Sequence, residues 1–65
     1  MITINGEQKE LSQDMVLQLL LEQEGYDIRR IAVEINGEIV SKTLFNDTIV
    51  KSGDSIEVVS FVGGG

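Results

Sequence analysis

The sequence predicts an α+β fold in which one main helix packs on one face of a mixed sheet of four to five strands. Three features predict it: short segments that alternate apolar and polar residues, two Asn-Gly pairs, and a single leucine-rich segment with helical spacing. The chain has 65 residues. A chain of this length forms one small core, since it buries only about 60% of the surface that it exposes when unfolded.

Two Asn-Gly pairs divide the predicted strands, because this pair favours a two-residue type I′ hairpin. Asn5-Gly6 joins the alternating segment Met1–Ile4 to a more polar returning strand at Glu7–Leu11. Asn36-Gly37 joins a central strand, whose isoleucine and valine residues alternate over 31–35, to a short apolar run. Both pairs therefore predict tight turns between neighbouring antiparallel strands.

A leucine-rich segment predicts the single main helix. Its apolar stripe has the spacing of one helical face and consists of Val16, Leu17, Leu20 and Leu21. Either Ser12 or Asp14 is expected to cap a helix that begins near Met15. Gly25 is expected to end it, because glycine readily adopts the left-handed conformation that follows many helices.

The last predicted strand follows a short strand at Thr48–Lys51 and a turn at 52–54. Side chains alternate between the two faces of a strand, so with Ile56 and Val58 in the core, Val59 and Phe61 lie on the open side. We interpret these two as a docking patch, because exposed apolar clusters often mark interfaces. The alternative is a bulge that shifts the register and places Phe61 in the core.

Composition excludes several classes of function. The sequence contains no cysteine and no histidine, so it offers no thiolate site and lacks the usual acid–base residue; we expect neither a metal site nor a self-contained enzyme. A net charge of -6 argues against nucleic-acid binding, which needs lysine and arginine, and is compatible with a basic partner surface. We expect no membrane span and no signal peptide, and hence a cytoplasmic protein.

Three glycines follow the last apolar strand. The sequence predicts a folded domain over 1–62 and a flexible glycine tail over 63–65. A backbone without side chains can enter a channel too narrow for other residues, and three residues reach at most about 10 Å. A frayed end or a linker remnant is the alternative explanation of the tail composition.

Four features resemble the ubiquitin-like sulfur carriers with a β-grasp fold, and within them the ThiS type. They are the length, the central segment 34–40, the basic-x-x-aromatic segment Lys42-Thr-Leu-Phe45, and the closing segment Ser52-Gly-Asp-Ser-Ile-Glu-Val-Val-Ser-Phe-Val-Gly-Gly-Gly65. The resemblance covers the whole chain, and its last quarter is the specific part. It implies a carrier of sulfur for thiamine biosynthesis rather than a catalyst.

The resemblance assigns the chemistry to the end of the chain. A ThiF-type adenylating enzyme would use ATP to activate the carboxylate of Gly65, and a sulfur-donor protein would convert it to a thiocarboxylate for a ThiG-type thiazole synthase. The carrier itself would bind no cofactor. Gly63 and Gly64 would thread into the partner sites. The expected partner interface is Val59, Phe61, Val62, Lys42 and Phe45, although Lys42 and Phe45 could equally support the fold.

Two alternative functions share the same fold and tail. The chain could be a MoaD-like small subunit of molybdopterin synthase, although such chains usually have a proline near the tail and this one contains none. It could also be a ubiquitin-like protein tag joined to other proteins. Among the charged residues, Arg29-Arg30 could bind a phosphate, but a turn before the central strand is the favoured interpretation.

Overall fold

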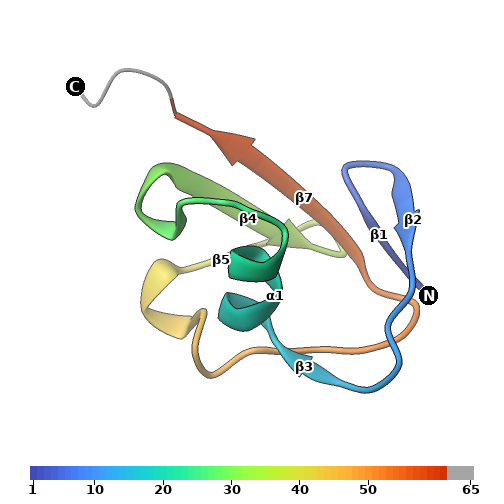
Figure 1. The fold of residues 1–65 in the computed structure, drawn as a ribbon. Helices are drawn as coiled ribbons and strands as arrows, with labels where there is room; N and C mark the ends of the chain where they lie inside the picture. The colour runs from blue at the N-terminus through green and yellow to red at the C-terminus, as the bar shows by residue number, and fades with distance from the viewer. Residues whose placement is uncertain (62–65) are drawn as a thin grey trace.

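A five-stranded mixed sheet with one main helix is the framework of the computed structural model, which describes residues 1–61 (Figure 1). The sheet has the strand order β2-β1-β7-β4-β5. Its strands are β1 (Ile2–Ile4), β2 (Glu7–Lys9), β4 (Ile31–Ile35), β5 (Glu38–Val40) and β7 (Ser55–Ser60). β7 runs parallel to β1 and antiparallel to β4, so the sheet is mixed as predicted.

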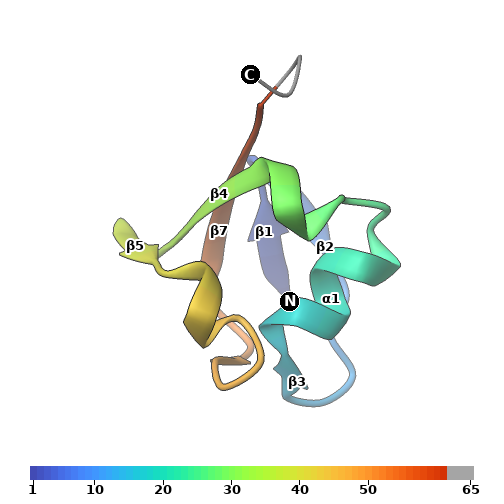
Figure 2. The ribbon, with the colours of Figure 1, turned by 90° about the vertical axis from the view of Figure 1, so that its left-hand side faces the viewer.

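One side of this sheet carries all the other elements of the described chain. They are α1 (Leu17–Gln23), the 3₁₀ turns η1 (Ile28–Arg30) and η2 (Lys42–Leu44), and the two-stranded pair of β3 (Met15–Val16) with β6 (Ile49–Val50). Figure 2 shows α1, η2 and β3 together beneath the sheet. Within residues 1–61, no element covers the opposite side, which we call the open face.

Both Asn-Gly pairs form the predicted hairpin turns. Asn5 and Gly6 have φ angles of 51° and 83°, and Asn36 and Gly37 have φ angles of 52° and 85°. Positive φ at both central residues defines the type I′ turn. The asparagine side chains also reach β7: Asn5 Oδ1 accepts a 2.7 Å hydrogen bond from Val58 N–H, and Asn36 Oδ1 accepts a 2.9 Å bond from the N–H of Ser55. The two turns therefore hold β7 from both sides.

The helix begins at Leu17, two residues later than predicted, and has no side-chain cap. Met15 and Val16 are extended because they pair with β6. Main-chain carbonyls that are distant in sequence accept hydrogen bonds from the first helical N–H groups. Leu17 donates to Thr48 O at 2.8 Å, and Gln18 donates to the carbonyl of Phe45 at 3.0 Å. The prediction that Ser12 or Asp14 caps the helix is therefore wrong.

The end of the helix is as predicted. Gly25 has a φ of 89°, the left-handed conformation. Its N–H donates to Glu22 O at 3.1 Å, and Tyr26 N–H donates to the Leu21 carbonyl at 3.0 Å. These two bonds form a Schellman motif, which satisfies carbonyls that would otherwise lack partners.

The core lies between α1 and the covered face of the sheet. Three of the four residues predicted for the apolar stripe of the helix are buried in it: Leu17, Leu20 and Leu21. The remaining buried residues are Ile2, Ile4, Ile31, Val33, Phe45, Val50, Ile56 and Val58. Among residues 1–61 no polar or charged residue is buried, so the stability of the core comes from the removal of hydrocarbon surface from water.

Candidate functional site

The side chains of β7 lie alternately in the core and on the open face. Ile56 and Val58 are buried, whereas Val59 is 60% exposed and Phe61, the residue after the strand, is 54% exposed. The predicted register of this strand is therefore confirmed, and the alternative in which Phe61 enters the core is wrong. Contact of Val59 and Phe61 with a partner stays a prediction.

Phe61, the last described residue, is hydrogen-bonded to the residue that precedes β4. Phe61 N–H donates a 2.7 Å hydrogen bond to the carbonyl oxygen of Arg30. The ammonium of Lys42 donates a 2.7 Å bond to the carbonyl of Arg29 and lies 6.0 Å from the centroid of the Phe61 ring. At this distance the cation still interacts with the ring quadrupole. Lys42 therefore lies beside Phe61, the last described residue, and its contact with a partner stays a prediction.

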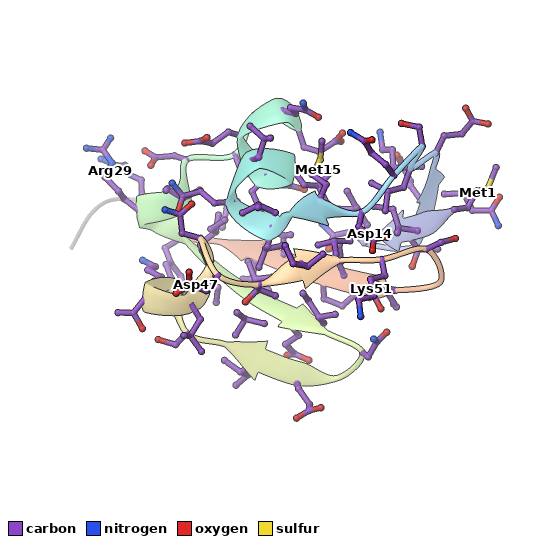
Figure 3. All side chains as sticks on the ribbon, turned by 90° about the horizontal axis from the view of Figure 1, so that it is seen from below. Met1, Asp14, Met15, Arg29, Asp47 and Lys51 are labelled. Carbon is purple, nitrogen blue, oxygen red and sulfur yellow. The ribbon has the colours of Figure 1, made fainter. Side chains whose placement is uncertain are left out.

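The two neighbouring arginines are organised by Asp27. Asp27 Oδ1 accepts a 3.0 Å bond from Arg29 N–H and caps η1, and both arginine side chains lie within ion-pair distance of its carboxylate. The side-chain hydrogen bond from Arg29 is the main cause that lowers the pKa of Asp27, and the same bond raises the pKa of Arg29. Arg29 projects outward at one end of the molecule (Figure 3). The arginines thus form the predicted turn before β4.

Phe45 is a core residue, which corrects its assignment to the partner interface. Its side chain is 1% exposed, and it follows η2 directly on the covered side of the sheet. A ring this deeply buried has no surface to offer to a partner. The two ends of the basic-x-x-aromatic segment therefore differ: Phe45 is part of the core and supports the fold, and Lys42 lies at the surface.

Four of the predicted site residues lie outside the described residues. They are Val62, Gly63, Gly64 and Gly65. Their roles, and the boundary between a domain over 1–62 and a tail over 63–65, stay predictions.

The open face contains two carboxylates that the sequence analysis did not connect. Glu34 on β4 is the register partner of Glu57 on β7, and both are exposed. On the open face, the next pair toward Phe61 is Ala32 with Val59, and Ile39 of β5 is the partner of Glu34 on its other side. Alternation along each strand predicts that these residues share a face, but the register between β4 and β7 is needed to bring the two glutamates together.

The described residues hold no other candidate site at this end of the molecule. In this part of the chain, no cluster of histidine, cysteine and carboxylate residues is large enough to hold a metal ion. A shallow hollow between β5, η2 and β6 is lined by residues such as Val40, Leu44 and Ile49, and not by Val59 or Phe61. None of the helices in the described residues is both long and apolar enough to span a bilayer.

Comparison with known families places the chain. The profile of the ThiS family matches residues 2–65. The chain belongs to the ThiS family. A crystal structure of the thiamine biosynthesis protein ThiS from Geobacter metallireducens superposes with a TM-score of 0.82 at 31% identity, covering 98% of this chain and 97% of that one. The solution structure of a thiamine biosynthesis protein from the same organism superposes with a TM-score of 0.78. The mixed sheet with one main helix is thus the predicted β-grasp fold.

Curated relatives of this ThiS-family chain are of two kinds. A thiazole synthase from Paramagnetospirillum magneticum is 44% identical over 64 residues, which are 98% of this chain and 20% of that protein. An uncharacterized protein, ycf40, from Porphyra purpurea is 39% identical over 64 residues and is covered over 90% of its length. The chain thus spans about a fifth of the length of the thiazole synthases that it matches, and nearly all of the smaller relatives.

Proposed function

We propose that this chain is a sulfur carrier of thiamine biosynthesis whose chemistry takes place at the main-chain carboxylate of Gly65. Its membership in the ThiS family is the observation that carries the proposal. The likeness to the ThiS protein of Geobacter metallireducens supports thiamine biosynthesis. The relatives named thiazole synthase favour this pathway over the molybdopterin synthase and protein-tag alternatives.

Two activation steps give the terminal carboxylate its reactivity. A carboxylate is a poor electrophile because resonance stabilises it, so a ThiF-type partner first joins it to the AMP part of ATP, and pyrophosphate leaves. Sulfide-level sulfur derived from cysteine, brought by a sulfur-donor protein, then displaces AMP and leaves a thiocarboxylate at Gly65. This soft nucleophile is delivered to a ThiG-type thiazole synthase. The carrier is therefore a protein co-substrate, and its partners are the catalysts.

The described geometry supports delivery at a distance from the folded domain. β7 ends at Ser60, and Phe61 is fastened to Arg30 at the edge of the domain. From Phe61 the remaining chain to Gly65 spans at most about 17 Å. Gly63 and Gly64 carry no side chains, so this segment fits a narrow channel. The carboxylate thus reaches a partner's active site while the domain stays outside it.

Intact-mass measurement tests the proposal. The chain is incubated with ATP, a ThiF-type adenylating enzyme and a sulfur source, and we expect a mass gain equal to the exchange of one oxygen for sulfur, localised to Gly65. The matched control lacks Gly64 and Gly65; it is expected to melt at the same temperature and to stay unmodified. An unmodified full chain, beside a known carrier that loads under the same conditions, would show that the proposal is wrong.

A further inference from the structure

Two exposed glutamates occupy opposite positions on neighbouring strands of the open face. Glu34 and Glu57 are directly opposite in the antiparallel pair of β4 and β7. On one face of such a pair the Cβ atoms of opposite residues lie about 4.5–5.5 Å apart, and like charges in this position destabilise the sheet. The chain therefore keeps a repulsive pair in its most central strands, where a neutral pair would favour the fold.

No cation within residues 1–61 relieves this repulsion. The ion pairs of the described chain join Lys9 to Glu7 and Glu24, and the two arginines of η1 to Asp27. The ammonium of Lys42 is directed to the carbonyl of Arg29. Neither glutamate takes part in an ion pair within residues 1–61, so a cation supplied by a partner would be a favourable addition to this face.

The glutamate pair is bordered by exposed apolar side chains. Ile39, the β5 partner of Glu34, is 80% exposed, and Val59, paired with Ala32, lies two residues from Glu57 along β7 and therefore on the same face. A purely apolar partner would bury both carboxylates without compensation, at high cost. A hydrated basic loop would gain nothing from Ile39 and Val59. The surface that fits both features is apolar with one cationic side chain at its centre.

We propose that thiazole synthase docks on this face and places an arginine or lysine side chain between Glu34 and Glu57. We call the face, made of Ala32, Glu34, Ile39, Glu57 and Val59, the acid-centred face. The proposal rests on the proposed function, and the occupant is argued from the relatives: proteins named thiazole synthase contain a region that matches 98% of this chain. In those proteins the two parts belong to one polypeptide, so a matched surface between them is expected.

Arginine suits this position better than lysine. Its planar guanidinium carries several donors in a fixed fork and bonds two oxygens at once, whereas the ammonium of lysine is a more strongly hydrated point charge. The acid-centred face is also continuous with the strand that leads to Phe61. A partner seated here holds β7 at its surface and has the remaining chain close to its own active site.

Binding of the unloaded chain to thiazole synthase tests the proposal without ATP or sulfur. The test variant is the double substitution Glu34→Gln/Glu57→Gln. The matched control is Glu10→Gln/Asp14→Asn, which changes the net charge equally at exposed residues between β2 and β3. We expect the test variant to bind at least tenfold more weakly, equal to about 1.4 kcal/mol, and the control to stay within about twofold of the parent.

The free test variant is expected to move in the opposite direction, with a higher melting temperature than the parent, because the repulsion between the two carboxylates is removed. A general loss of structure would lower both stability and binding, so the opposite signs distinguish docking from a folding defect. Higher salt should weaken binding of the parent more than binding of the test variant.

Apolar variants of the same face provide a second comparison. Val59→Ser is expected to weaken binding more than Leu19→Ser, which changes an exposed leucine on α1, the element that covers the opposite side of the sheet. Equal binding by the test and control variants, or no measurable binding by the parent, overturns the docking proposal. The sulfur-loading assay is separate: loading without docking contradicts this proposal alone, and docking without loading contradicts the proposed function alone.

Discussion

Lys42 lies beside Phe61, the last described residue, with the lysine ammonium 6.0 Å from the centroid of the phenylalanine ring. The same ammonium donates to the carbonyl of Arg29, and the Phe61 N–H donates to that of Arg30. Two successive carbonyls before β4 thus hold a side chain from η2 and the main chain that follows β7. This arrangement holds Phe61 against the residues that precede β4.

Replacing Lys42 by methionine should loosen this point while preserving the fold. Methionine keeps the apolar stem but loses both the hydrogen bond to Arg29 and the charge near Phe61. The free energy of unfolding should fall by about 1 kcal/mol. Amide hydrogen exchange followed by NMR should show faster exchange at Phe61. The control is Lys51→Met, since Lys51 lies well away from Arg29 in Figure 3. Equal exchange rates at Phe61 in both variants would contradict the proposed role of Lys42.

The two phenylalanines should respond to truncation in opposite ways. Phe45→Ala removes a ring that is 1% exposed and should lower the free energy of unfolding by about 3–5 kcal/mol. Phe61→Ala removes a half-exposed ring and should cost about 1 kcal/mol or less. Denaturant unfolding measures both. The reverse order of losses would place Phe61 in the core and Phe45 at the surface.

These two rings also show what the sequence could and could not predict. Alternation along β7 is a local property, so the exposed positions of Val59 and Phe61 follow from the pattern of one strand. Phe45 lies in a turn without a repeating pattern, and its burial depends on how η2 folds back on the sheet. The pairing of Glu34 with Glu57 depends on strand register, which the sequence does not reveal locally.

The beginning of α1 likewise could not be predicted from neighbouring residues alone. Ser12 and Asp14 are typical capping residues, yet carbonyls of Phe45 and Thr48 bond the first helical N–H groups. Phe45 and Thr48 lie in the loop between η2 and β6, so their carbonyls are distant in sequence from the helix that they bond. The end of the helix was predictable because Gly25 and its Schellman bonds lie within a few consecutive residues.

Removal of the expected caps should therefore leave stability unchanged. We expect Ser12→Ala and Asp14→Ala to change the free energy of unfolding by no more than about 0.5 kcal/mol, the usual range for surface substitutions. A working N-cap would cost about 1 kcal/mol. Asp27→Ala is the positive control, because Asp27 accepts the Arg29 N–H bond of η1. A loss at Ser12 or Asp14 equal to that at Asp27 would show that a side-chain cap operates at α1.

The Asp27 carboxyl should make stability depend on pH in the acid range. Its pKa is lowered, chiefly by the side-chain hydrogen bond from Arg29 and then by the main-chain bond. A group with a lowered folded-state pKa contributes stability above its unfolded value, about 3.9, and loses that contribution as the pH falls through the folded value. NMR titration should show the lowered pKa, and Arg29→Gln should move it back toward the usual value. Titration of the parent at the usual value would contradict this.

The two hairpin asparagines allow a matched test of how β7 is held. Glycine tolerates the positive φ of both positions, so Asn5→Gly and Asn36→Gly remove the side-chain acceptors and leave the turns intact. Each substitution also removes one exposed side-chain bond, from Asn5 Nδ2 to the Tyr26 hydroxyl at 3.5 Å or from Asn36 Nδ2 to Asp54 Oδ1 at 3.0 Å. The Val58 N–H bonded to Asn5 is partly buried, whereas the Ser55 N–H bonded to Asn36 is at the surface.

Water can replace the lost acceptor at Ser55 but reaches Val58 less easily. An unsatisfied buried donor costs about 1–3 kcal/mol, so Asn5→Gly should lower the free energy of unfolding more than Asn36→Gly. Any penalty from glycine flexibility is common to both variants and cancels in the comparison. Urea unfolding of the two variants and the parent measures the difference. A larger loss for Asn36→Gly would mean that the exposed end of β7, rather than its centre, depends on its turn.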